Sequence, residues 1–518
     1  MSPASRASRA VASATALALL AGGVTACGSG EKAAAPSSST TPLFSTPPNA
    51  FEQQRADGVT ALLDALTKAL TSGDRAGLDA LIDPLATPAF RQSLHRAQDD
   101  LRPAPAPRAA TSVAPTATPS AAAPQSPAPQ RSVPRRSPRS GDRPSSSAPA
   151  ATVPRGSNLV LRTLQYRLAP SAGPERLIGG ELGVRLNDAG ASDTWVTPIT
   201  ASYALGGAAR PGVDEPVIDV PQELAVARYG DDWKLLGDGS LAPDESVDPT
   251  QEVRPPELVP WAFGGLLADD VPTAGGTSSI LSYPGTDRTV AKVRDQLAPA
   301  VAAVTAFWGD AWVRKAVIQV TGTPEQFAGF TRTAPGETNA AAAATVFSRI
   351  DGGAKTVIGQ RVVLAPAAGQ LSVAGIGVVL RHELTHVATR LDTADDAPMW
   401  LTEGVAEYVG RRGTKVDFTD VAPELSAQIA AGDVPKALPS DKDFSVDTDA
   451  ARLAYQSSWS FATFVAQKYG EDKLKRMYLA VAQGGPVAKT DAALAGALGV
   501  DRATAVAQWR TWLGKQVR

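Results

Sequence analysis

The sequence of 518 residues predicts an α+β protein with two folded domains. The first is a module of helices and an antiparallel sheet, and the second is mainly helical with a small strand-rich lobe. Apolar residues recur at helical spacing before residue 102, alternate at strand spacing between residues 158 and 238, and return to helical spacing after residue 372. The 43% of hydrophobic residues is enough to form sizeable cores.

Residues 1–26 predict a targeting segment rather than part of the fold. Two arginines precede an apolar run at 11–23, which is too short to span a bilayer as a stable helix. The letters VTA then lead to Cys27, the single cysteine. This ending resembles the lipobox of bacterial lipoproteins, which implies that Cys27 is diacylated and becomes the mature N-terminus at a membrane. The alternative is an ordinary secretory signal that leaves a free thiol. In either case we expect an extracytoplasmic protein, and in the first a lipid-anchored one, with residues 27–50 as a flexible tether.

Residues 51–245 predict the first folded module. Apolar residues between 59 and 70 recur at helical spacing, and a second short helix follows. Five later stretches have strand character and are separated by Gly, Pro and Asp turns: 159–166, 177–186, 195–205, 223–229 and 233–236. The helical start and the final hairpin resemble NTF2-like domains, which implies a binding or spacer module.

Residues 103–156 form an insertion rich in Pro, Ala, Ser and Arg within this module. Such a composition cannot bury a core, so we expect disorder. The stretch 102–155 has eight arginines and one aspartate, a charge of 8 − 1 = +7, which leaves −2 − 7 = −9 for the remainder. It is either a solvated linker or a contact to anionic lipid or an anionic wall polymer. No basic motif with interleaved aromatic residues is present, so nucleic acid is not an expected partner.

After a Pro- and acid-rich linker at 246–257, residues 258–518 predict the second domain. Its first part has an expected strand-rich lobe, with a helix at 288–308, a strand at 316–320, a short helix at 324–330 and strands at 345–347 and 356–364. The stretch 357–366 is expected to be an edge strand, which can pair with an extended peptide.

The letters HELTH at residues 382–386 carry the strongest chemical signal. An apolar stripe after the expected N-cap Ser372 places them on a helix. His382 and His386 then project from one face, one turn apart, and can bind one zinc ion, with Glu383 beside them as a general base. The alternative is two histidines on an ordinary helix. The third histidine, His95, lies far away in sequence and is expected to be a surface or packing residue.

A second helix is expected from Pro398 to Gly410. The 403 − 386 − 1 = 16 residues between His386 and Glu403 suffice to end one helix and return another against it. Together, HELTH and the letters WLTEGVAE at 400–407 resemble the gluzincin zinc metallopeptidases of the thermolysin and aminopeptidase-N type. The resemblance implies that Glu403 is the third zinc ligand and that Glu407 orients a histidine ligand. The alternative for Glu407 is a solvated helix carboxylate.

The letters AYQSSWSF at 454–461 resemble the helix of aminopeptidase-like gluzincins whose leading tyrosine donates to the oxyanion. That resemblance implies the same role for Tyr455, and charge developing on the attacked carbonyl oxygen requires such a donor. Ser458 replaces the usual glycine, and a packing tyrosine is the alternative. The GxMEN segment that binds a free amine is missing, so aminopeptidase specificity is not implied. Further helices are expected at 423–431, 450–469, 473–482, 491–498 and 503–517.

The sequence therefore predicts a zinc-dependent metallopeptidase that cleaves a peptide or protein substrate at the outer face of a bacterial membrane. One alternative is a non-catalytic surface lipoprotein whose NTF2-like module binds a partner. Another is a metal-dependent hydrolase that acts on a non-peptide wall component.

Overall fold

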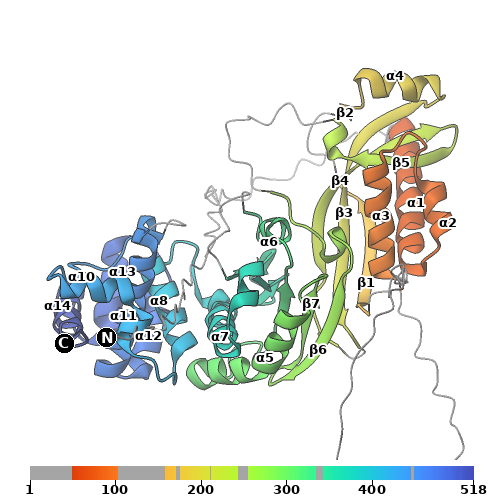
Figure 1. Cartoon of the computed structure of the whole chain (residues 1–518). Helices are drawn as coiled ribbons and strands as arrows, with labels where there is room; N and C mark the ends of the chain where they lie inside the picture. The colour runs from red at the N-terminus through yellow and green to blue at the C-terminus, as the bar shows by residue number, and fades with distance from the viewer. Residues whose placement is uncertain are drawn as a thin grey trace, which may run out of the picture.

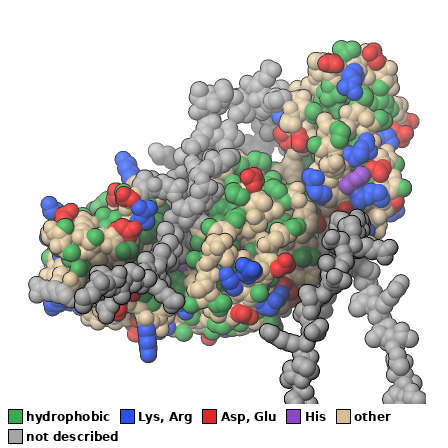
Figure 2. Space-filling view, viewed as in Figure 1, with side chains coloured by type: hydrophobic (Ala, Val, Ile, Leu, Met, Phe, Trp, Pro, Cys, Tyr) green, Lys and Arg blue, Asp and Glu red, His purple; other side chains and the backbone are tan. Residues whose placement is uncertain are grey.

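The computed structural model describes residues 50–102, 158–170, 175–209, 212–242, 255–333, 342–444 and 449–517. Cys27, the targeting segment, the tether and nearly all of the Arg-rich stretch at 102–155 lie outside the described residues. In Figure 1 the N-terminal helices and sheet lie at one end, the strand-rich lobe in the middle and a helical lobe at the other end. Acidic and basic side chains are interspersed over the face shown in Figure 2.

The N-terminal part packs helices on one face of an antiparallel sheet, as Figure 1 shows. Aspartate and threonine caps start two of the helices. The helices are α1 (Ala50–Ser72), α2 (Arg75–Leu81) and α3 (Pro88–Leu101). The strand order is β1-β3-β4-β5, with β2 paired to β3. The strands are β1 (Val160–Leu168), β2 (Arg176–Leu177), β3 (Asp193–Gly207), β4 (Ile218–Tyr229) and β5 (Asp232–Asp238). Helices beside antiparallel strands confirm the α+β prediction.

The strand predicted at 177–186 is wrong. Only Arg176–Leu177 is a strand, and Gly180–Asp188 is a helix, α4. Apolar residues alternate at 182, 184 and 186, which also fits a strand. In the helix, Leu182 and Leu186 share one face, and Leu186 is fully buried while Val184 is 61% exposed.

The strand-rich lobe contains a second sheet of order β6-β7-β8-β12-β9. Its strands are β6 (Leu267–Thr273), β7 (Gly276–Ser282), β8 (Val317–Val320), β9 (Ala343–Val346) and β12 (Arg361–Leu364). The edge strand predicted at 357–366 is wrong, because β12 lies inside the sheet between β8 and β9. A positive φ of 69° at Gly359 separates β12 from β11 (Thr356–Ile358), which pairs with β10 (Arg349–Asp351). Among the described strands, β9 pairs only with β12 and forms the edge of the sheet that contacts α7.

Two helices pack against this sheet, and a helical lobe follows them. The helices α5 (Asp287–Trp308) and α7 (Val373–Thr389) share one core with one face of the sheet, and α6 (Pro324–Thr331) contributes to the core on the other face. The lobe contains α8 (Met399–Arg411), α9 (Phe418–Val421), α10 (Pro423–Ala430), α11 (Asp449–Tyr469), α12 (Glu471–Val481), α13 (Val487–Leu498) and α14 (Arg502–Leu513). The expected late helices are thus confirmed. Among the described residues, no helix is both long and apolar enough to cross a membrane.

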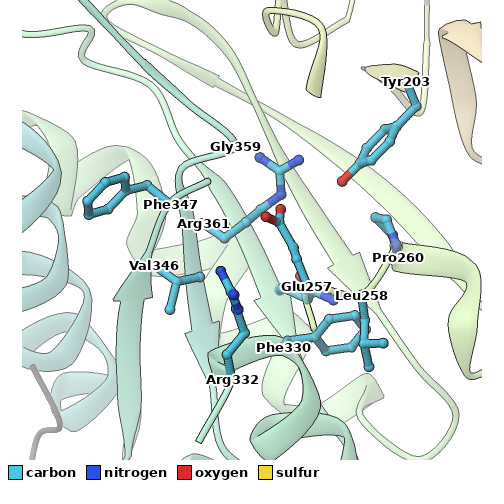
Figure 3. Close-up of a pocket in the computed structure, with 11 residues that line it drawn as sticks. Tyr203, Glu257, Leu258, Pro260, Phe330, Arg332, Val346, Phe347, Gly359 and Arg361 are labelled. Atoms are coloured by element: carbon cyan, nitrogen blue, oxygen red, sulfur yellow. The ribbon is translucent and has the colours of Figure 1, made fainter. Parts of the chain in front are cut away.

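The N-terminal part covers the other face of the second sheet, and one hydrophobic core runs through both. Leu63 of α1 and Val363 of β12 belong to this core and are fully buried. Trp261 packs edge-on against Tyr203 at 5.1 Å between ring centroids. An ion pair between Arg361 and Glu215, each 6% exposed, also joins the two parts. In Figure 3 Tyr203 points across this seam toward Arg361, beside a small cavity of about 30 Å³.

Candidate active site

Helix α7 starts where the sequence predicts and buries the residues of interest. The Ser372 hydroxyl accepts a hydrogen bond from the Gly375 N–H at 3.1 Å, which confirms the predicted N-cap. The apolar face of α7 is fully buried against α5 and the sheet. His382 and Glu383 are buried as well, and the side chain of His386 is 20% exposed. The site therefore opens toward solvent on the His386 side.

Helix α8 returns against α7 and brings Glu403 to the histidines. A glycine allows the close approach, because a Cβ on Gly410 would lie 3.1 Å from the carbonyl oxygen of Val378. On the other side of α8, a Cβ on Gly404 would lie 2.6 Å from the carbonyl oxygen of Ser458 in α11. Three helices thus converge at this point.

The ligand atoms of His382, His386 and Glu403 form a compact cluster that can hold a metal ion. The two Nε2 atoms lie 3.1 Å apart, and the Glu403 carboxylate oxygens lie 3.3 Å from Nε2 of His382 and 3.6 Å from Nε2 of His386. A tetrahedral ion with bonds of about 2.0–2.1 Å separates its ligand atoms by roughly 3.3 Å. Both Glu403 oxygens are buried without a hydrogen-bond partner among the described residues. Two imidazoles and a carboxylate in this arrangement fit zinc.

The electrostatics of the cluster favour a charged Glu403. Burial alone would raise the pKa of Glu403, but His386 and His382 together lower it to about 2. Burial opposes protonation of His382, yet the neighbouring carboxylates, Glu403 first, raise its pKa. Glu403 is therefore ionised in the cluster, which is the form that can bind a cation.

Glu407 lies one turn beyond Glu403 and faces the other nitrogen of His382. Its Oε1 is 3.5 Å from Nδ1 of His382, within ion-pair range but without hydrogen-bond geometry. Its Oε2 accepts a hydrogen bond from Nε of Arg411 at 2.9 Å. Glu407 is 4% exposed, so it is not a solvated carboxylate. An acidic group at this place can orient the imidazole.

Glu383 is held by a residue that the sequence does not single out. Thr345 in the edge strand β9 donates a hydrogen bond to Oε2 of Glu383 at 2.6 Å. Burial raises the pKa of Glu383, while His382, His386 and the Thr345 hydroxyl partly oppose the shift. The sequence places Thr345 in a strand, but nothing local pairs that strand with the metal helix.

Tyr455 lies on α11, near enough to the cluster for the charge of Glu403 to act on it. It is 6% exposed, its ring packs edge-on against Phe444 at 5.1 Å, and its hydroxyl is buried without a partner among the described residues. Burial, followed by the charges of Glu403, Glu407 and Glu383, raises its pKa well above the usual value of 10. The hydroxyl therefore stays protonated and available as a donor.

His95 lies outside this cluster, in α3 of the N-terminal part. Its Nε2 is 2.7 Å from Oδ1 of Asp79, and its side chain is 29% exposed. Such a partly exposed contact fits a surface residue.

Comparisons with known proteins agree with the site. Residues 344–515 match the family model described as Peptidase MA superfamily. A search of the curated proteins finds no match. Among solved structures, Legionella pneumophila aminopeptidase A in complex with aspartic acid is similar at 13% identity and a TM-score of 0.28. That match covers 48% of this chain and only 28% of the aminopeptidase chain.

Proposed function

We propose that residues 344–515, a gluzincin-like domain of the Peptidase MA superfamily, hydrolyse peptide bonds with one zinc ion held by His382, His386 and Glu403. The main support is the convergence of these three ligand atoms from two helices, with a buried, hydrogen-bonded Glu383 beside them. When bound, zinc supplies Lewis-acid polarisation of the substrate carbonyl and lowers the pKa of a nearby water.

The chain's own residues then move protons and stabilise charge. Glu383 takes a proton from the attacking water and passes it to the leaving amine. The hydrogen bond from Thr345 to Oε2 fixes the carboxylate in position for this transfer. Tyr455 donates its hydroxyl to the oxygen on which negative charge develops. Glu407, held by Arg411, keeps the His382 ring in its ligating orientation.

The edge strand β9 offers a place for the substrate main chain. It pairs with β12 on one side and, among the described strands, with none on the other. An extended peptide can add to such an edge through main-chain hydrogen bonds. Because Thr345 lies in β9 and contacts Glu383, a peptide bound there passes beside the general base.

We also propose that the protein acts at the outer face of a bacterial membrane through a lipid on Cys27. The support is the lipobox-like ending of the targeting segment. We propose likewise that residues 51–245 form an NTF2-like module and that 102–155 contacts anionic lipid or an anionic wall polymer. Incorporation of a labelled fatty acid by the wild type and not by Cys27→Ala tests the anchor, and equal labelling would contradict it.

The test of the peptidase function is Glu383→Gln. This change keeps the size of the side chain and the metal ligands but removes the base. We expect zinc content to be unchanged and peptide hydrolysis to fall by about a hundredfold or more. Wild-type turnover in Glu383→Gln would refute the mechanism. Bound zinc with no hydrolysis even in the wild type would favour the non-catalytic lipoprotein instead.

A further inference from the structure

A large groove lies where the N-terminal part meets the strand-rich lobe. Its volume is about 870 Å³, which lies within the range of about 300–1,000 Å³ typical of ligand sites. The walls come from the loop 213–216 of the N-terminal part, the segment 310–317, the hairpin of β10 and β11, and the C-terminal end of α7. None of the three metal ligands lines it.

The groove continues the line of the edge strand and the metal helix. Strand β9 runs antiparallel to β12, so Thr345 lies opposite Val362, which lines the groove. On α7, Glu383 contacts Thr345, and Val387, one turn later, also lines the groove. Ile350 of β10, the strand that follows β9 in the chain, also lines the groove, so a chain bound along β9 can continue past Val346 toward it.

The walls carry exposed apolar side chains. Three lining residues from separate segments are exposed large hydrophobic side chains: Val313 at 56%, Ile350 at 40% and Leu391 at 51%. Exposed apolar residues that gather around one hollow mark an interaction site more often than scattered ones do. The lining also includes Trp312, whose indole N–H is buried without a hydrogen-bond partner in the described part of the chain.

The charges on the walls favour a neutral occupant. The charged lining residues are four acids, Asp214, Glu215, Asp310 and Asp392, and two lysines, Lys315 and Lys355. Three of the acids pair with arginines: Asp214 with Arg162, Glu215 with Arg361, and Asp310 with Arg314. With those three arginines counted, the net charge around the groove is 2 + 3 − 4 = +1. A strongly acidic or basic ligand would thus gain little. In addition, β10 and β11 pair only with each other among the described strands, so an extended main chain can lie along this hairpin.

We propose that this groove binds the distal residues of an extended, apolar polypeptide substrate whose scissile bond lies beside Glu383. The inference rests on the proposed peptidase function and specifies its substrate class, which is long, apolar, unfolded segments rather than short peptides. Because residues 213–216 form one wall, the N-terminal part takes part in substrate selection.

The experiment uses the full chain with Leu391→Asp or Ile350→Asp. Val487→Asp is the matched control, since Val487 is 69% exposed on α13 and does not line the groove. Binding of a long, apolar, fluorophore-labelled peptide is measured by anisotropy in the Glu383→Gln background. Hydrolysis of the same peptide and of a tetrapeptide is measured with Glu383 intact.

We expect each groove variant to weaken binding of the long peptide and raise its KM by roughly tenfold, as loss of one apolar anchor does. Tetrapeptide hydrolysis and the Val487→Asp protein should be unchanged. Equal binding of the long peptide by the groove variants and the control overturns the inference, even if hydrolysis is intact. A change in oligomeric state confined to the groove variants overturns it too, because a second copy of the chain then occupies the groove. If the groove variants bind the long peptide more weakly but no protein, the wild type included, hydrolyses it, the result would contradict the peptidase function and support the groove as a binding site.

Discussion

Gly404 lies where α8 and α11 touch, and its replacement by alanine should lower both stability and turnover. The added Cβ would lie 2.6 Å from the carbonyl oxygen of Ser458 and 3.0 Å from its Cβ. Non-bonded heavy atoms rest at about 3.5 Å or more, so α11 must move away from α8 by several tenths of an ångström.

The size of the effect follows from two opposing contributions. Overpacking of a well-filled core costs about 1–3 kcal/mol. Alanine in a helix is favoured over glycine by about 1 kcal/mol, which offsets part of that cost. The net loss of about 1–2 kcal/mol should lower the Tm by roughly 2–5 °C. Tyr455 lies on α11 and would move with it. We therefore expect kcat to fall as well, because a misplacement on the order of 1 Å can slow a reaction about a hundredfold.

Thermal unfolding and steady-state hydrolysis of the purified full chain measure both effects. Gly496→Ala is the control, because Gly496 also lies in a helix, α13, and nothing lies within 4 Å of its added Cβ. That variant should be as stable as the wild type or slightly more stable. A Gly404→Ala protein with wild-type Tm and kcat would refute the claim that close packing of α8 and α11 sets the position of Tyr455.

Thr345→Val should lower kcat by about tenfold with little change in KM, because Glu383 loses the hydrogen-bond donor at 2.6 Å. Thr345→Ser keeps a hydroxyl and should restore most of the lost kcat. Equal kcat in the two variants would contradict this role of Thr345. Arg411→Met should lower the zinc affinity by about tenfold or more, because Arg411 holds Glu407 against His382. Competition with a chelator measures this affinity, and an unchanged value would argue against a role of Arg411 in orienting His382. Burial raises the pKa of Asp100 from 3.8 to about 7 despite two backbone N–H donors, so its protonated form favours the native state. The resulting stabilisation should be complete below about pH 4 and disappear as the pH rises through about 7. Denaturant titrations at several pH values should therefore show that the free energy of unfolding declines less between about pH 4 and about pH 7 in Asp100→Asn than in the wild type. The same pH dependence in both proteins would contradict the raised pKa of Asp100.

Features encoded over short distances in the sequence are the ones that could be predicted. The HELTH letters, the N-cap Ser372 and the apolar stripe of α7 all lie within one helix, so spacing alone places His382 and His386 together. The length of the connection to α8 was enough to bring Glu403 back to them. Most helices of the C-terminal lobe follow from the same periodicity.

Features that depend on pairing between distant segments could not be predicted. Thr345 acts on Glu383 only because β9 takes the edge of the sheet, and strand order is not written in the local sequence. The stretch 357–366 shows strand character but gives no sign of its neighbours. In α4, alternating apolar residues fit a strand as well as a helix, and burial of Leu186 decides for the helix.

The shared core between the two parts is a further feature that only the structure shows. Val363 and Trp261 resemble ordinary core residues in the sequence, yet both pack in a core built largely by the N-terminal helices and sheet. Residues 258–518 alone would expose this apolar face to water and leave Arg361 without Glu215. Experiments on the metal site should therefore use the full chain.

The most direct test of the account is the metal content of the purified full chain, compared with His386→Ala and Glu383→Gln. The cluster of His382, His386 and Glu403 predicts about one zinc ion per chain in the wild type and in Glu383→Gln, and loss of zinc in His386→Ala. A wild-type chain that binds no zinc even after reconstitution, or a His386→Ala chain that binds it equally well, would contradict the metal site on which the proposed function rests.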